Sequence, residues 1–108
     1  QRRARFPLVQ IRKGRSVHHL RSLSGSQFDF IYVDAAHDSA NVLRDTVLAW
    51  DILQLGGVLV WDDYGWTVMP TEVERPKQAV DAFLRCYSPA LEELPGRGWQ
   101  VAVRKVRA

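Results

Sequence analysis

Two apolar runs, separated by a segment with helical periodicity, occupy the middle of the chain. The first run, residues 28–33, is rich in aromatic and β-branched residues, which predicts a strand buried on both faces. The second, Val58 to Trp61, predicts another buried strand. Between them, four apolar residues recur at steps of four, three and three and predict one stripe of an amphipathic helix: Leu43, Val47, Trp50 and Leu53. Strand, helix and strand over roughly 30 residues are typical of a parallel βαβ unit.

The residues that flank this helical segment favour defined ends. Asp38 or Ser39 is suited to the N-cap, because a short polar side chain accepts a hydrogen bond from the first turn. Gly56-Gly57 supplies a stop for the helix, since glycine readily adopts the left-handed conformation of a C-terminal cap.

Each of the two predicted strands runs into carboxylates, Asp34 after the first and Asp62-Asp63 after the second. Parallel neighbours would bring these residues to one edge of the sheet, where open α/β sheets bind ligands. Three carboxylates in a small space stay ionised only beside a cation, and oxygen ligands suit Mg²⁺, Mn²⁺ or Ca²⁺. Successive strand residues point to opposite faces, so Asp62 and Asp63 reach one ion only if the chain turns there. The pattern predicts a divalent-metal site; the alternative is that these residues cap helices or turns.

The remaining segments complete a small α/β domain. A strand over residues 8–11 and a turn at Gly14 lead to a short helix capped by Ser16. After Tyr64, residues 65–75 have neither period and predict a loop, in which Tyr64 and Trp66 either line a pocket or anchor the loop. Three further elements are predicted: a helix from Pro76 to about Tyr87, and strands over residues 91–94 and 99–106 joined by a turn as an antiparallel hairpin.

The ordered set of motifs from Phe28 to Tyr64 resembles the C-terminal half of the class I S-adenosylmethionine-dependent methyltransferases. It is most similar to the metal-dependent small-molecule O-methyltransferases, of the catechol and macrocin O-methyltransferase types. The matching residues are Asp34, His37 three residues later, Gly56-Gly57, the four apolar residues Val58 to Trp61, and Asp62-Asp63.

This resemblance implies a partial Rossmann-like methyltransferase sheet, a parallel βαβ unit plus a C-terminal antiparallel hairpin, flanked by helices. It implies that Gly14, Ser16 and Asp34 contact S-adenosylmethionine, and that Asp34, Asp62 and Asp63 hold Mg²⁺ or another divalent cation. His37 stands where the family has its general base, and the acceptor would be a small-molecule hydroxyl. Residues 1–108 form one domain from which the cofactor-binding N-terminal half is absent, so we expect this chain to be inactive alone.

The same resemblance predicts an uncovered sheet edge. In the family the strand that ends at Asp34 pairs with the first strand of the domain, which this chain lacks. Either residues 8–11 fold back to cover the edge, or two chains pair edge to edge. The short basic segment is a poor substitute for a central strand, and we therefore favour a homodimer.

Charge, hydropathy and cysteine content narrow the possible functions and locations of the protein. A net charge of +3, spread mainly over the two ends, provides no coherent basic face with aromatic platforms, which argues against nucleic-acid binding. No apolar run reaches the ~20 residues of a membrane span, and a cytoplasmic location is expected. The single cysteine, Cys86, excludes an internal disulfide and is expected to be a buried apolar residue. The start at Gln1 suggests a fragment or a processed product.

Two other functions remain open at this point. One is a non-catalytic, methyltransferase-like fragment that acts in protein interaction through its open edge. The other is a carboxylate-metal hydrolase or phosphotransferase, because aspartates on an α/β sheet serve several chemistries. The identity of the acceptor does not follow from the sequence.

Overall fold

The structure, a computed structural model, describes residues 9–11, 28–34 and 38–108. Within these residues five strands form one sheet in the order β1-β2-β3-β5-β4. Their bounds are Val9–Ile11 (β1), Phe28–Val33 (β2), Leu53–Trp61 (β3), Leu91–Glu93 (β4) and Val101–Lys105 (β5). β1, β2 and β3 are parallel, whereas β5 is antiparallel to both β3 and β4. The predicted α/β class, a parallel βαβ unit followed by an antiparallel hairpin, is confirmed.

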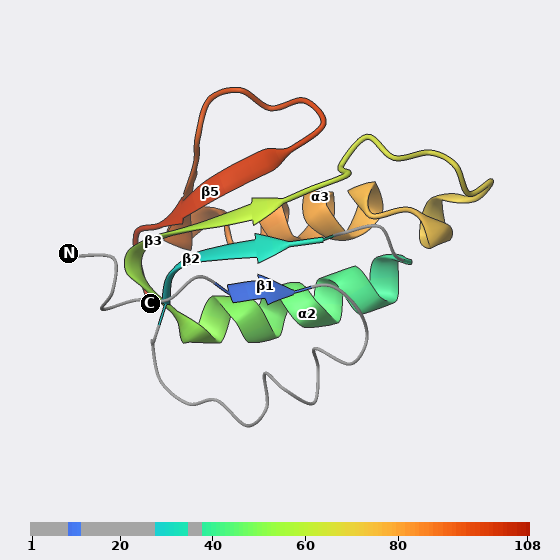
Figure 1. The fold of residues 1–108 in the computed structure, drawn as a ribbon. Coiled ribbons are helices and arrows are strands. Elements are labelled where there is room, and N and C mark those ends of the chain that lie inside the picture. The colour runs from blue at the N-terminus through green and yellow to red at the C-terminus, as the bar shows by residue number, and fades with distance from the viewer. Residues whose placement is uncertain (1–8, 12–27, 35–37) are drawn as a thin grey trace.

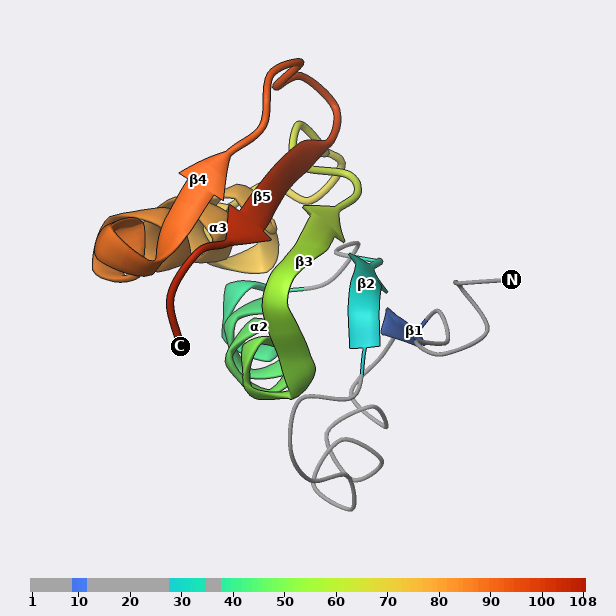
Figure 2. The same cartoon turned by 90° about the vertical axis from the view of Figure 1, so that its left-hand side faces the viewer.

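Two helices cover the same face of this sheet (Figures 1 and 2). They are α2, Ser39–Ile52, and α3, Lys77–Cys86, and they contact each other. Alternation along the strands sends the fully buried side chains towards these helices. The most deeply buried side chains in the central part of the strands are Ile31, Val33, Leu59, Trp61, Val101 and Val103.

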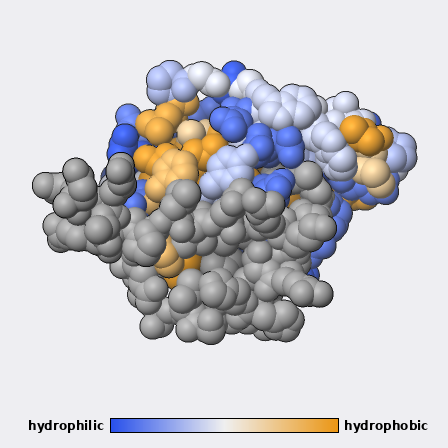
Figure 3. All heavy atoms as spheres, in the orientation of Figure 1, coloured by the Kyte–Doolittle hydropathy of each residue, from blue (hydrophilic) through white to orange (hydrophobic). Residues whose placement is uncertain are grey.

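The opposite face of the sheet carries apolar side chains that are only partly buried, among them Phe30, Val58 and Val60. The space-filling view shows apolar atoms gathered on this side, in the direction from which Figure 1 is seen (Figure 3). The described helices therefore cover one face of the sheet, and no described helix lies over the other.

Helix α2 begins as predicted but buries a different stripe. Asp38 is the N-cap, and its side chain accepts a hydrogen bond from the backbone N–H of Asn41 at 3.4 Å. The predicted stripe is wrong in part, because Leu43 is 37% exposed while Thr46 is buried. Thr46 is tolerated in the core because its hydroxyl donates to Val42 O at 2.7 Å and accepts from Trp61 Nε1 at 2.9 Å. These two bonds satisfy a polar group that a hydropathy pattern counts as surface.

The predicted glycine stop at Gly56-Gly57 is also wrong. Helix α2 ends at Ile52, and both glycines lie inside β3, where Gly56 has φ +85°. The end of the helix is capped by other groups. The Leu53 N–H donates to Ala49 O and Trp50 O, and Lys105 Nζ donates to Trp50 O at 2.7 Å and Leu53 O at 2.8 Å. With these carbonyls satisfied, the helix needs no glycine cap.

The strand edge predicted to be uncovered is covered within the chain. β1 pairs with β2 in parallel register, Val9 opposite Ile31 and Ile11 opposite Val33. The short segment thus takes the place beside β2 that the resemblance assigned to a missing strand, and the premise of an open edge at residues 31–33 is wrong. Pairing within one chain avoids the entropy that association of two chains would cost. Self-association remains a prediction that must rest on another surface or on β1 itself.

The C-terminal elements follow their predicted order. Pro76 is the N-cap of α3, and Ala79, Val80 and Phe83 form its buried face. A short 3-10 helix, η2 (Glu72–Glu74), interrupts the loop before it, and another, η3 (Ser88–Ala90), follows it. The prediction for Cys86 is wrong, since this residue is exposed. Tyr87 instead fills the inward position, where its ring stacks on Phe83 with centroids 4.1 Å apart.

Candidate functional site

The carboxylates predicted to meet at one sheet edge lie at the ends of two adjacent strands. Val33 and Trp61 are register partners, and Asp34 and Asp62 follow them directly. The backbone N–H of Asp62 donates to Val33 O at 2.9 Å, which continues the ladder one step past β3. The parallel pairing therefore brings Asp34 and Asp62 to the same edge, as the sequence predicted.

The Asp62 carboxylate is held by donors from three parts of the chain. The Tyr32 hydroxyl donates to Oδ2, and the backbone N–H of Asp63 donates to Oδ1 at 2.9 Å. Gln100 Nε2 donates to the same Oδ1 at 3.4 Å from β5's side of the sheet. The hydrogen bond to Asp62, then burial, and the charges of Asp62, Asp34 and Asp63 raise the pKa of Tyr32 to about 12. The phenol is thus a neutral donor in a strongly negative environment.

Asp63 turns the chain away from the sheet. Its φ is 59°, in the left-handed region that aspartate tolerates better than most residues, and its carbonyl accepts from Trp66 N at 2.9 Å. Trp99 Nε1 donates to its Oδ1 at 2.8 Å. Burial is the main cause that raises the pKa of the Asp63 carboxyl; the Trp99 bond lowers it, and the charges of Asp62 and Asp34 raise it further. The turn required for the aspartate pair to share one site is therefore present.

The structure describes only some of the other predicted site residues. Gly14, Ser16 and His37 lie outside the described residues, as does the short helix predicted after Ser16. Asp34 is described and lies close enough for its charge to act on Tyr32 and Asp63. Among the described residues, no three Asp, Glu, His or Cys side chains are arranged around one point as ligands of a metal ion. The metal site thus remains a prediction, supported by proximity and donor chemistry and not by a preformed ligand cage.

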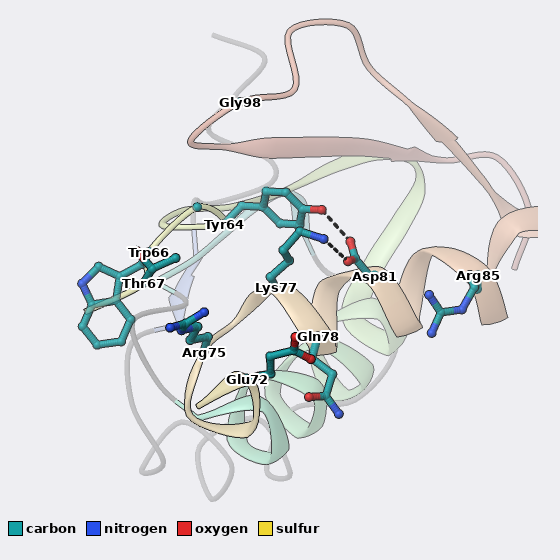
Figure 4. A pocket seen from close by; sticks show the side chains of 11 residues that line it. Tyr64, Trp66, Thr67, Glu72, Arg75, Lys77, Gln78, Asp81, Arg85 and Gly98 are labelled. Atoms are coloured by element: carbon teal, nitrogen blue, oxygen red, sulfur yellow. Dashed lines mark hydrogen bonds and ion pairs between the residues drawn. The ribbon is translucent and has the colours of Figure 1, made fainter. Parts of the chain in front are cut away.

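A cavity of about 500 Å³ opens beside this edge (Figure 4). Its walls are Tyr64 to Thr67 of the loop after β3, the segment around Glu72 and Arg75, the outer side of α3, and Gly98. The sequence predicted that Tyr64 and Trp66 either line a pocket or anchor the loop, and both residues line this cavity. A volume of this size is typical of small-molecule sites, which span about 300–1,000 Å³.

Tyr64 is the anchor of this cavity. It is only 8% exposed, and its hydroxyl donates to Asp81 Oδ1 at 2.6 Å and accepts from Arg97 Nη1 at 3.0 Å. Lys77 Nζ bonds Asp81 Oδ2 at 2.7 Å. Burial alone would raise the pKa of Asp81, but the hydrogen bonds from Lys77 and Tyr64 and the charges of Lys77 and Arg97 lower it on balance. Asp81 is therefore an ionised hub that fixes one wall.

Sequence reasoning missed several residues of this region. Tyr32 was recoverable, because it precedes Asp34 by two residues and so shares its face of the strand. Trp99 and Gln100 reach the aspartates across the β4–β5 hairpin, and Asp81 reaches Tyr64 from α3. These contacts join residues far apart in sequence, and no local periodicity signals them.

The sheet order and the one-sided helices define an open, Rossmann-like α/β fold, and in such folds ligands bind at the carboxyl ends of the strands. A family model described as "Methyltransferase domain" matches residues 2–64, more than half of the chain. The chain therefore belongs to the methyltransferase domain family.

Solved structures show the same fold at low sequence identity. A protein from Corynebacterium glutamicum is 21% identical with a TM-score of 0.61, over 85% of this chain and 45% of that one. The O-methyltransferase from Bacillus cereus in complex with SAH is 20% identical with a TM-score of 0.52, over 84% and 46%. The methyltransferase MycE of the mycinamycin biosynthetic pathway, in complex with Mg and SAH, is 17% identical with a TM-score of 0.54, over 88% and 31%. This chain thus spans less than half the length of each of these three proteins.

Two further observations concern sequence relatives and membrane spans. No curated protein gives a significant sequence match. Among the described residues, no helix has the length and the apolar character needed to cross a membrane.

Proposed function

We propose that this chain carries the acceptor half of an S-adenosylmethionine-dependent methyltransferase that methylates the hydroxyl of a small molecule with the assistance of a divalent cation. The observation that carries this proposal is that Asp34 and Asp62 directly follow two paired parallel strands, with Asp63 next in the chain, in a member of the methyltransferase domain family. The presence of Mg and SAH in the MycE structure, and of SAH in the Bacillus cereus O-methyltransferase, supports the choice of cation and cofactor.

The donor chemistry of the edge suits a hard divalent ion. The three aspartates offer only oxygen atoms, which Mg²⁺ and Mn²⁺ prefer. Burial first, and then the charges of Asp62 and Asp34, raise the pKa of Asp63, and a cation would offset the repulsion between these charges. Asp62 and Asp63 already accept hydrogen bonds from Tyr32 and Trp99, so these donors fix the carboxylate orientations. When bound, the ion would lower the pKa of an acceptor hydroxyl, and adenosylmethionine would supply the methyl group.

The chain's own residues would hold and orient the acceptor. His37, three residues after Asp34, is proposed to take the proton from the acceptor hydroxyl, because an imidazole near its ordinary pKa suits that role. Gly14, Ser16 and Asp34 are proposed to contact the cofactor, with Asp34 at the boundary between cofactor and acceptor. The buried Tyr64 and the half-buried Trp66 line the neighbouring cavity and would contact an acceptor bound there.

The length of the chain limits what it does alone. We propose that the 108 residues bind adenosylmethionine poorly, because the glycine-rich loop that cradles the cofactor in the related family is not part of them. Equilibrium dialysis with labelled adenosylmethionine measures this. Micromolar affinity would contradict the proposal and would require a different cofactor surface.

The decisive test of the proposed reaction supplies the cofactor half. The chain is fused behind the corresponding half of the Bacillus cereus O-methyltransferase, and transfer of labelled methyl to catechol is measured with Mg²⁺. We expect transfer that Asp62→Asn lowers about a hundredfold, since positioning of the reacting oxygen is lost. Asp29→Asn, near the other end of β2, is the matched control and should stay within about twofold. Equal transfer by the wild-type and Asp62→Asn fusions would contradict the proposal.

A further inference from the structure

The cavity beside the carboxylate edge adjoins the proposed reaction site. Its wall begins at Tyr64, the residue after Asp63, and Gly98 on the opposite side precedes Trp99, which bonds the Asp63 carboxylate. The backbone links the two walls, because Tyr64 N donates to Trp99 O at 2.8 Å. The cavity therefore borders the Asp62-Asp63 turn on both of these walls.

The cavity is preformed by hydrogen bonds that hold its loop. Ser39 Oγ, from the first turn of α2, donates to Arg75 O at 2.7 Å. Arg75 Nε donates to Met69 O at 2.7 Å and closes the segment on itself. Together with the Tyr64–Asp81 bond, these contacts fix the wall before any ligand arrives, which lowers the entropic cost of binding.

The charges that line the cavity leave guanidinium groups available. The negative charge of Asp81 is already offset by Lys77 at 2.7 Å and Arg97 at 3.9 Å. Arg85 makes no hydrogen bond or ion pair with any of the described residues, and Arg75 uses Nε and Nη2 only for backbone carbonyls. Glu72 also lines the cavity, and its carboxylate forms no ion pair with a described residue. Apart from the Asp81 group, the cavity therefore has two arginines, Arg75 and Arg85, and one carboxylate.

One aromatic surface in the cavity is also available. The Tyr64 ring already lies 5.4 Å from both Lys77 Nζ and the Arg97 guanidinium carbon. Trp66 is half-buried and makes no ring or cation contact with the described residues. In the close-up, Trp66 and Arg75 lie towards one end of the cavity and Arg85 towards the other (Figure 4). A flat ring can stack on the indole while the Arg75 guanidinium, at the same end of the cavity, binds a carboxylate through paired N–H groups.

We infer that this cavity binds the acidic end of the acceptor, and that the acceptor is a small aromatic carboxylate whose reacting hydroxyl lies at Asp62-Asp63. The inference rests on the proposed methyl transfer for the second part only. The cavity would bind an aromatic carboxylate whether or not any methyl group is transferred.

The first experiment tests the cavity alone, by calorimetric titration of the 108-residue chain with benzoate and with benzamide, its neutral isostere. We expect benzoate to bind at least fivefold more tightly than benzamide. Arg75→Gln should weaken benzoate binding at least fivefold more than it weakens benzamide binding, whereas Arg107→Gln, exposed near the C-terminus, should leave both unchanged. Equal affinities for the two probes, no binding of benzoate, or an Arg75→Gln variant that weakens both probes to the same extent would overturn the inference.

A second titration tests the connection to the reaction site. Protocatechuate, a benzoate with two adjacent ring hydroxyls, is titrated in the presence of Mg²⁺. Asp62→Asn should weaken protocatechuate at least threefold and leave benzoate unchanged, because benzoate has no hydroxyl to reach the aspartates. If Asp62→Asn weakens neither ligand, the acidic end is not part of an acceptor bound at Asp62-Asp63, and that part of the inference fails while the cavity assignment stands on the first experiment.

Discussion

The Tyr32 hydroxyl donates a hydrogen bond to the Asp62 carboxylate and so joins the ends of two parallel strands. Tyr32 lies in β2 two residues before Asp34, and Asp62 follows β3. Tyr32 therefore orients the Asp62 carboxylate from β2, the strand that Asp34 follows. The side chains of the two neighbouring strands thus contact each other directly at this edge.

Replacing Tyr32 by Phe removes this bond and should lower the free energy of unfolding by about 1 kcal/mol at pH 7, the usual value for one partly buried hydrogen bond. The matched control is Tyr87→Phe, because no described residue hydrogen-bonds the Tyr87 hydroxyl. Urea denaturation of the three proteins measures the difference. A loss as large in Tyr87→Phe as in Tyr32→Phe would contradict a specific role for the Tyr32–Asp62 bond.

The pH dependence of that difference has a definite sign. The folded state raises the pKa of Tyr32 from 10.0 to about 12, so the folded protein favours the protonated phenol. The stabilisation is fully present below pH 10.0 and is lost as the pH rises towards 12. The gap between wild type and Tyr32→Phe should therefore be equal at pH 7 and pH 9 and should shrink above pH 10. A gap that grows over that range would show that the phenol is not held in its protonated form.

The stabilising contribution of Asp81 should be lost at acid pH, whereas that of Tyr32 is lost at alkaline pH. The pKa of Asp81 is lowered from 3.8, so its stabilising contribution is present above pH 3.8 and is lost as the pH falls through the lower, folded value. Asp81→Asn should cost about 1–2 kcal/mol at pH 7, because a charged acceptor of the Tyr64 and Lys77 hydrogen bonds is replaced by a neutral one. The cost should decline below pH 3.8. Thermal unfolding of both proteins across pH 2–7 measures it, and a cost independent of pH would contradict the ionised hub.

Gly57 is constrained by the helix-to-strand junction. A Cβ on this residue would lie 2.7 Å from Leu53 Cδ1 and 2.9 Å from Gln54 O, closer than real contacts allow. Gly57→Ala should therefore destabilise the fold by about 1–3 kcal/mol through overpacking. Gly98→Ala is the control, because its nearest contact would be an ordinary 3.9 Å to Gly96 O. Chemical denaturation distinguishes them, and equal stability of both variants would mean that β3 shifts without cost.

The parts of the fold that the sequence predicted are those set by local pattern. The runs at residues 28–33 and 58–61 lie in strands, and Asp34 and Asp62 directly follow them at one edge of the sheet, because the two strands are parallel neighbours. The N-cap at Asp38 follows from the same local chemistry. These features depend on neighbours within one turn or one strand, and periodicity reports them directly.

The errors come from contacts across the fold. Thr46 is buried because Trp61 supplies a donor fifteen residues away, and the C-terminus of α2 needs no glycine because Lys105 reaches it from β5. Cys86 is exposed because Tyr87 takes the inward position. The pairing of β1 with β2 likewise depends on which strands are present to pair, and the hydrophobic pattern within each strand does not reveal it. Tertiary context decided each of these positions.

The central claim is that Asp34, Asp62 and Asp63 form one divalent-cation site, and the Trp99 indole is its natural reporter. Trp99 Nε1 donates to Asp63 Oδ1 at 2.8 Å, whereas Trp50 lies next to Leu53 at the opposite end of β3. Substoichiometric Mn²⁺, followed by proton–nitrogen NMR, should broaden the Trp99 indole signal first and leave that of Trp50 sharp. Asp62→Asn should abolish the selective broadening, and Asp29→Asn should retain it. Uniform broadening of both indoles, or selective broadening that survives Asp62→Asn, would contradict a cation site at this edge.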